Sequence, residues 1–192
     1  MNPIVLASGS PRRRQLLEML GMPFRVVLPE VDETRAAGEP PETYVVRLAR
    51  AKAQAVAARE PGSLVLGADT TVEVRGQVLE KPSSADEAAA MLAKLQGRTH
   101  HVLTAVALAR DGRIEHALDV TDVTFRPLDK ATIDDYVATG EPMDKAGAYA
   151  VQGKGAVLVD WIRGDFFGVM GLPVRLVIEL LDRFDVTYRF TR

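Results

Sequence analysis

Small, hydroxyl-bearing and cationic side chains follow one another at the start of an expected helix. Free backbone N–H groups and the helix dipole make a helix N-terminus attractive to anions. Ser8 and Ser10 add hydroxyl donors to this turn. Arg12 and Arg13 add guanidinium groups that match phosphate oxygens, whereas Arg14 is expected to face solvent because successive helical residues are about 100° apart. The turn predicts a phosphate site or, alternatively, a capped helix with a solvated basic turn.

An acidic residue, Asp69, directly follows the apolar run 64–68. Functional groups of α/β sheets gather at the carboxyl ends of strands. Partial burial there would raise the pKa of Asp69 towards that of a general base, or a hard cation would hold the carboxylate ionised. The alternative is a turn aspartate that caps the next segment.

Other charged side chains lie beside small residues along the chain. Acidic residues without any cysteine and with only three histidines favour Mg²⁺ or Mn²⁺ if a metal is bound. Most such side chains on a protein surface are simply solvated. His100 and His101 are expected on opposite faces of a strand, so they do not form one site. The candidates are Asp32, Glu33, Lys52, Lys81, Asp144, Lys145, Gln152 and Lys154.

The elements that must position these residues alternate between apolar runs and helical patterns. The hairpin signals require antiparallel pairing, and the first strand–helix crossovers permit parallel pairing. We therefore predict an α/β fold with a mixed sheet flanked by helices. The expected strands are 3–7, 24–27, 64–68, a hairpin over 71–79, a long hairpin over 101–125, 157–162 and 186–190; the expected helices are 11–20, 42–59, from the cap Ser84 to 95, from the cap Asp129 to 139, and 173–184.

Composition narrows the class of protein. The 192 residues are 47% hydrophobic and 26% charged, which excludes a disordered chain. The net charge of −2 argues against a basic nucleic-acid-binding protein. The absence of cysteine excludes disulfides and thiolate sites. No apolar run is as long as a membrane span, and the N-terminal pattern is the reverse of a signal peptide, so we expect a cytoplasmic protein with no membrane partner.

Together these segments resemble the Maf family of nucleoside triphosphate pyrophosphatases. The matching pieces occur in family order and cover almost the whole chain. The resemblance implies a single Maf-like nucleotide pyrophosphatase domain over residues 1–192, with a two-lobed inosine-triphosphatase-like fold, a central cleft, a divalent metal cation and frequently a homodimer. The pieces are Leu6–Arg13, Asp32–Glu33, Tyr44–Ala49 with Lys52, Gly67–Thr70, Glu80–Pro82, Tyr136–Gly140, Asp144–Tyr149, Gln152–Gly153 and Gly171–Pro173.

Within the family, the pieces at 144–149 and 152–153 resemble the branch that hydrolyses dTTP and UTP; the branch that acts on 7-methyl-GTP carries different residues there. The resemblance implies that dTTP and UTP, and also modified pyrimidine triphosphates, are cleaved at the α–β bond. The products would be a nucleoside monophosphate and pyrophosphate. One departure is Phe166-Phe-Gly168, where the family often has an aromatic residue followed by a polar one.

The resemblance also implies roles for individual residues. Asp69 would be the proton acceptor, or else a metal ligand with Glu33 or a bound hydroxide as the base. The specificity positions would be Arg12, Thr70 and Gln152. The triphosphate and metal region would be lined by Ser8, Ser10, Arg13, Glu33, Lys52, Lys81 and Lys145.

Two other functions compete with this one. A nucleotide-binding regulator of septum formation that lacks turnover would be expected to lose Asp69 or Lys81, and both are present. A nucleic-acid binder built on Arg12–Arg14 is disfavoured by the net negative charge and the few aromatic residues. We therefore expect a nucleoside triphosphate as the partner and no nucleic acid.

Overall fold

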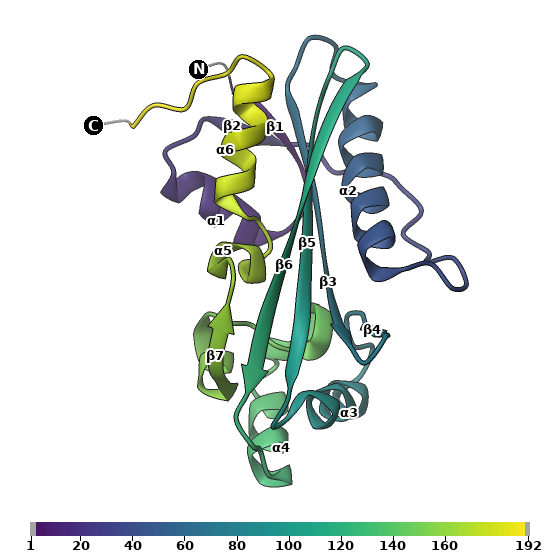
Figure 1. Ribbon diagram of the computed structural model, residues 1–192, viewed down its shortest axis with the longest axis vertical. Helices are drawn as coiled ribbons and strands as arrows, with labels where there is room; N and C mark the ends of the chain where they lie inside the picture. The colour runs from purple at the N-terminus through teal and green to yellow at the C-terminus, as the bar shows by residue number, and fades with distance from the viewer. Residues whose placement is uncertain (1–2, 191–192) are drawn as a thin grey trace. The chain divides into compact units, whose positions relative to one another are not determined.

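The computed structural model describes residues 3–190 and contains one mixed sheet whose strands run in the order β2-β1-β3-β5-β6-β7, with β4 paired to β3. Figure 1 shows the strands and the helices. The strands are β1 (Ile4–Ala7), β2 (Phe24–Val26), β3 (Val65–Val74), β4 (Gln77–Leu79), β5 (Thr99–Arg110), β6 (Arg113–Phe125) and β7 (Val159–Arg163). The α-helices are α1 (Pro11–Met19), α2 (Pro41–Ala57), α3 (Ala85–Leu95), α4 (Lys130–Ala138), α5 (Phe166–Met170) and α6 (Val174–Arg183), and the 3₁₀ helices are η1 (Glu141–Asp144), η2 (Ala146–Ala148) and η3 (Gly153–Leu158).

The chain divides into two compact units. The first unit holds residues up to 69, 104–119 and those from 171 onward; the second holds 70–103 and 120–170. The mixed sheet with flanking helices confirms the predicted α/β class. The central cleft and the single functional domain over residues 1–192 stay predictions.

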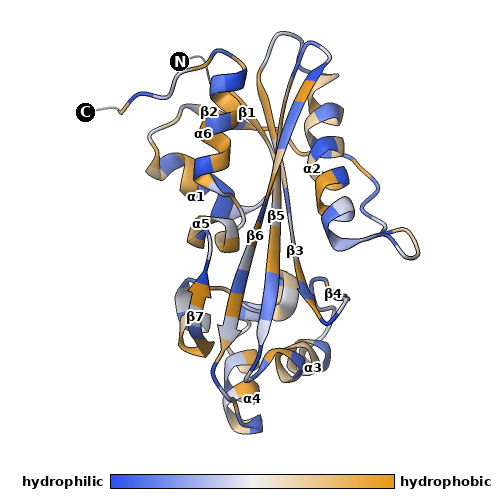
Figure 2. Cartoon of the chain, viewed as in Figure 1, coloured by the Kyte–Doolittle hydropathy of each residue, from blue (hydrophilic) through white to orange (hydrophobic). Residues whose placement is uncertain are grey.

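In the first unit, β1 lies between β2 and β3 and is parallel to both. The crossover from β1 to β2 is α1, as parallel pairing of successive strands requires. Helix α2 buries one face, and Figure 2 shows apolar and polar residues alternating around it. Lys52 is the charged residue on that buried face. The burial of one lysine among apolar neighbours already marks this helix face as unusual.

Gly67 brings α2 close to β3. A Cβ atom built on Gly67 would lie 2.4 Å from the carbonyl oxygen of Ala49 and 2.6 Å from the amide nitrogen of Ala53, both in α2. These distances are shorter than real Cβ contacts, so only glycine permits this approach. The close packing places Lys52 against the strand residue two positions after Gly67.

In the second unit, β3 and β4 form the predicted hairpin, which turns at Arg75 and Gly76 with φ values of 53° and 79°. Helices α3 and α4 lie side by side (Figure 1) and α3 also packs on η2. The side chain of Ser84 accepts a hydrogen bond from Glu87 N, and that of Asp129 accepts one from Thr132 N, so both predicted caps are confirmed.

Some predicted elements are wrong or misplaced. Residues 186–190 form no strand; the alternating pattern reflects packing instead, because Tyr188 is half-buried and its hydroxyl donates to Leu20 O at 2.8 Å. The strand expected at 157–162 starts later, since η3 occupies Gly153–Leu158. The short helix α5 at Phe166–Met170 is not among the expected elements. The strand expected at 64–68 and the first arm of the hairpin expected over 71–79 form one continuous strand, so Asp69 lies within β3 rather than after a strand.

Candidate functional site

The serine turn of the first unit is tied together by Arg13. Its guanidinium group donates to Ser8 Oγ at 2.9 Å, to Ala68 O at 2.9 Å and to Gly171 O at 2.8 Å. Arg13 is only 8% exposed, and Ser8 is also buried. Ser8 Oγ accepts a second bond from Ser10 N at 3.2 Å. Arg13 therefore joins the end of β1, the middle of β3 and the turn before α6.

The rest of this turn is arranged differently from a simple helix cap. Ser10 is the N-cap residue of α1, but its side chain makes no capping hydrogen bond. Pro11 starts the helix and has no N–H group to cap. Arg12 is half-buried and Arg14 is exposed, as predicted. The capped-helix interpretation of Ser10 is therefore wrong, and its hydroxyl is not used in capping.

A buried ion pair lies beside this turn. Lys52 Nζ is 2.7 Å from Asp69 Oδ1 and 2.9 Å from Glu33 Oε1. The side chains of Lys52 and Asp69 are 8% and 11% exposed, whereas that of Glu33 is 55% exposed. One ammonium group thus binds a buried carboxylate from β3 and a solvent-facing carboxylate from the loop before α2.

Burial and neighbouring charges act in opposite directions on these groups. Burial raises the pKa of Asp69 above its ordinary value, while the positive charges of Lys52 and Arg13 lower it and Glu33 adds a smaller rise. Burial lowers the pKa of Arg13, and the charge of Asp69 opposes that shift. The low dielectric of the interior strengthens these interactions. The site therefore holds a carboxylate whose affinity for a proton is increased and which is surrounded by cations.

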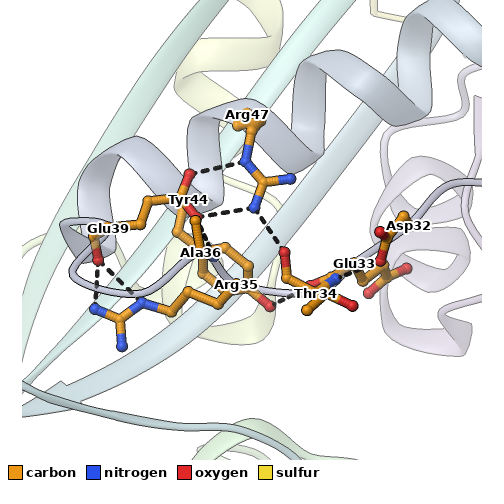
Figure 3. Close-up of polar contacts among 8 residues, drawn as sticks. All are labelled: Asp32, Glu33, Thr34, Arg35, Ala36, Glu39, Tyr44 and Arg47. Atoms are coloured by element: carbon orange, nitrogen blue, oxygen red, sulfur yellow. Dashed lines mark hydrogen bonds and ion pairs between the residues drawn. The ribbon is translucent and has the colours of Figure 1, made fainter.

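The loop that carries Glu33 is braced by α2, as Figure 3 shows. Tyr44 donates its hydroxyl to Glu33 O at 3.0 Å. Arg47 makes two bonds of 2.8 Å to the carboxylate of Glu39 and a third, of 3.0 Å, to Thr34 O. Its hydrogen bonds lower the pKa of Glu39 to about 2. Both ends of the loop are thus fixed to the helix that carries Lys52.

Asp32 lies in the first unit, where it accepts a hydrogen bond from Thr34 N at 2.8 Å, and the remaining predicted residues belong to the second unit. Thr70 is half-buried in β3. Lys81 is exposed after β4, and Gly147 N donates to Glu80 O at 3.2 Å, which places the segments at 80–81 and 145–147 side by side. Lys145 donates to Glu141 O at 2.6 Å. The roles proposed for Thr70, Lys81 and Lys145 stay predictions.

Gln152 stands out among these residues. Its side-chain oxygen Oε1 is buried and has no hydrogen-bond partner within residues 3–190. An unsatisfied buried acceptor is unfavourable by about 1–3 kcal/mol, so such groups are usually paired in the functional state.

Sequence reasoning missed Glu141, whose carboxylate accepts three hydrogen bonds in the second unit. The donors are the hydroxyl of Tyr136 at 2.9 Å and the backbone amides of Lys154 at 3.0 Å and Gly155 at 2.9 Å. The sequence feature that could have identified Glu141 is its place in a segment rich in glycine and proline. Carboxylates in such segments often accept hydrogen bonds from backbone N–H groups.

The donor set can be compared with the needs of a divalent metal. Mg²⁺ is commonly held by one or two carboxylates together with water and substrate phosphates. Glu33 and Asp69 already share one cation, the ammonium group of Lys52, and therefore lie close enough to serve one ion. No group of three or more acidic or histidine side chains suited to a metal occurs within residues 3–190. The two carboxylates fit an ion whose other ligands come from substrate and water.

Comparison with known proteins places the chain in a family. A family model described as "Maf-like protein" matches residues 3–184. The chain belongs to this Maf family. It is 50% identical over 184 residues to the dTTP/UTP pyrophosphatase of Symbiobacterium thermophilum, covering 96% of this chain and 95% of that protein. It is 53% identical over 186 residues to the protein of the same name from Salmonella typhimurium, covering 96% and 94%.

Among solved structures, the Staphylococcus aureus Ham1 protein is similar, with a TM-score of 0.52 and 16% identity over 95% of this chain and 97% of that one. This likeness concerns the fold alone. The resemblance to the Maf family drawn from the sequence is confirmed. Within residues 3–190, none of the helices has the length and apolar character that crossing a membrane requires.

Proposed function

We propose that this Maf-family protein hydrolyses dTTP and UTP to the nucleoside monophosphate and pyrophosphate. The observation that carries the proposal is the buried pair of Asp69 and Lys52 at 2.7 Å, with Arg13 beside it. The names of relatives that are about half identical over nearly the whole chain support the same reaction.

Positive charge is the first requirement of this reaction. A triphosphate carries about four negative charges, and cleavage of the α–β bond adds charge to the departing pyrophosphate, so catalysis rests on positioning and charge neutralisation. Arg12, Arg13 and the N–H groups at the start of α1 supply positive potential in the first unit. Lys81 and Lys145 add cations in the second unit. We assign these groups to the triphosphate.

Asp69 is our candidate general base. Because burial raises its pKa, it accepts a proton more readily than an exposed aspartate does. In this role it takes a proton from the water that attacks the α-phosphorus. The alternative is that Asp69 is a metal ligand and that Glu33 or a hydroxide acts as the base.

A divalent cation is part of the proposal. Glu33 and Asp69 are the residues that would hold Mg²⁺ or Mn²⁺. When bound, the ion supplies charge neutralisation on the phosphate oxygens and lowers the pKa of a coordinated water. The exposure of Glu33 supports this assignment, since its carboxylate is accessible to an ion that arrives with substrate.

Recognition of the base is assigned to Gln152, Arg12 and Thr70. The buried, unpartnered Oε1 atom of Gln152 supports this role, because uracil and thymine both carry an N–H donor at N3. A pyrimidine of this kind would satisfy that acceptor. We expect Arg12→Ala to change the choice of base more than the stability of the fold.

The test is a pyrophosphate-release assay on a panel of nucleoside triphosphates, with Mg²⁺ or Mn²⁺ and with chelator. We expect metal-dependent cleavage of dTTP and UTP to monophosphates. A preference for 7-methyl-GTP would keep the reaction but overturn the roles of Thr70 and Gln152. Folded protein that cleaves no member of the panel would instead favour a nucleotide-binding regulator.

A homodimer in the cytoplasm completes the proposal. The resemblance to the Maf family, which implies a homodimer, supports it. Sedimentation velocity of the purified protein measures the oligomeric state, and a monomer at micromolar concentration would contradict the dimer.

A further inference from the structure

The turn that carries Gln152 is built around one carboxylate of the second unit, that of Glu141. As described above, this side chain accepts N–H bonds from Lys154 and Gly155, which directly follow Gln152 and Gly153. Two backbone donors on one carboxylate fix both the position and the orientation of a turn, because charge-assisted hydrogen bonds are short and strong.

Tyr136 attaches the other end of the same turn. Its hydroxyl donates to Glu141 at 2.9 Å and accepts from Ala150 N at 3.2 Å. Tyr136 is 5% exposed, and burial raises the pKa of its hydroxyl, so the group stays protonated and can donate. The segment 150–155 is therefore held before and after Gln152 by one connected network.

The glycines of this turn allow the carboxylate to approach the backbone. A Cβ atom on Gly153 would lie 2.9 Å from Glu141 Oε2, and one on Gly155 would lie 2.6 Å from the hydroxyl of Tyr136 and 2.4 Å from Ala150 O. Gly153 also has a φ of 82°, which favours glycine. The turn is shaped to surround the two side chains that hold it.

Glu141 also contacts a second candidate substrate residue. Its backbone oxygen accepts the ammonium group of Lys145 at 2.6 Å. One residue thus fixes Lys145 through its main chain and the turn of Gln152 through its side chain.

We propose that Glu141 is a positioning residue that holds Gln152 in the orientation needed to select a pyrimidine base. This inference rests on the proposed function, since it concerns the substrate choice of that reaction. Glu141 acts through Gln152 and does not touch the reacting atoms. Its loss releases the turn, so the acceptor of Gln152 no longer stays in one place and discrimination between bases falls.

The test compares Glu141→Gln and Tyr136→Phe with the wild-type enzyme. Glutamine keeps the size of the side chain but replaces one acceptor oxygen with an NH₂ donor, which cannot accept from a backbone N–H group. Phenylalanine removes the hydroxyl alone. Ser84→Ala is the control, because it removes the cap of α3, a helix of the same unit that carries none of the residues holding the turn. We measure kcat and KM for UTP, dTTP, CTP and GTP, and we check folding by circular dichroism.

We expect the ratio of kcat/KM for UTP over CTP to fall about tenfold in both variants, with most of the change in KM for UTP, as the loss of one strong hydrogen bond at the base would produce. Ser84→Ala should keep the wild-type ratio. Hydrogen exchange should also show faster exchange of the amides of Lys154 and Gly155 in Glu141→Gln.

Ratios within twofold of the wild type in both variants would overturn the inference, since a purely structural role changes all substrates alike. If Glu141→Gln does not fold, Tyr136→Phe decides the matter alone. A wild-type enzyme that shows no activity on dTTP or UTP would overturn the proposed function and this inference with it, whereas an active wild type with unchanged variant ratios overturns the inference alone.

Discussion

The two units of this protein bury polar groups in opposite ways. The first unit buries charges close to one another: Arg13, Lys52 and Asp69 are each 8% exposed or less, and Lys52 and Asp69 form an ion pair. The second unit buries polar groups that stay neutral. His100 is 1% exposed, and its Nε2 atom lies 2.7 Å from the hydroxyl of Tyr149. Burial lowers the pKa of His100 to about 3 and raises that of Tyr149.

In the proposed function, this difference separates residues that take part in the reaction from residues that only pack. Buried ion pairs add little to stability compared with apolar groups of the same size, because desolvation offsets their attraction. Stability alone therefore does not account for the pair of Lys52 and Asp69, which agrees with the role proposed for it in the reaction. His100 instead packs edge-on against Phe125 and Tyr149, with ring centroids 5.0 Å and 5.3 Å apart, as core aromatic groups do.

Asp69→Asn gives the largest expected effect. The amide cannot accept the proton of water, so we expect turnover of dTTP to fall about a thousandfold while the fold is kept. Pyrophosphate release measures the turnover of dTTP, and thermal unfolding measures whether the fold is kept. The control is Asp182→Asn, which changes an exposed carboxylate of the same unit. Activity of Asp69→Asn close to that of the wild type would contradict the role assigned to Asp69.

Lys52→Met tests whether the buried charges depend on one another. Removing the ammonium group leaves Asp69 buried without its closest cation, and we expect the free energy of unfolding to fall by about 3 kcal/mol. Urea denaturation measures this free energy of unfolding. The matched control is Lys130→Met, which breaks an exposed pair with Asp134 and should change stability by less than about 0.5 kcal/mol. Equal effects of the two substitutions would remove the distinction drawn between buried and exposed charges.

His100→Phe tests the neutral core of the second unit. Between pH 6.5 and about 3, the unfolded wild-type chain binds a proton at His100 that the folded protein does not bind. The wild-type free energy of unfolding therefore falls by about 1.4 kcal/mol per unit as pH decreases through this window. Phenylalanine binds no proton, so the free energy of unfolding of the variant should lack this pH dependence. The stability of the variant relative to the wild type should therefore be greater at pH 5 than at pH 8.

Urea titrations across pH 4–8 measure that slope for the wild type and the variant. His116→Gln, at an exposed histidine, is the control and should keep the wild-type profile. Parallel profiles for His100→Phe and the wild type would mean that His100 does not stay neutral in the folded core.

Arg47→Gln gives the smallest expected effect on stability. It removes the two bonds to Glu39 and the one to Thr34, but this group lies near the surface, so we expect a loss of about 0.5–1 kcal/mol in urea denaturation. A loss as large as that of Lys52→Met would show that the loop brace is part of the structural core.

Much of the fold follows from local sequence signals. Turn residues at 75–76 and 111–112, and the caps Ser84 and Asp129, identified the hairpins and two helix starts. The residues at 186–190 misled the prediction because an alternating pattern reports which side chains are buried and not whether the backbone pairs. The continuity of β3 across residues 69 and 70 was missed, since polar residues within a strand look like its end.

The candidate site was predictable only for residues whose side-chain charge by itself suggests a role in the reaction. Lys52, Asp69 and Glu33 were found as charged candidates, and the structure brings them into contact. Glu141 was missed because its importance comes from backbone amides that lie 13 and 14 residues further along the chain. The 3₁₀ helices that bring those amides back to Glu141 depend on tertiary packing and leave little trace in local periodicity.

The close approach of α2 to Gly67 has a consequence for how the protein tolerates substitutions. A single added methyl group there would meet the backbone of α2 at 2.4 Å, and backbone cannot yield as a flexible side chain does. The helix would have to move away as a whole, and Lys52 would move with it. An alanine at residue 67 would thus change the distance between Lys52 and Asp69 without replacing any charged residue. The spacing of the two backbones therefore influences the pKa of Asp69.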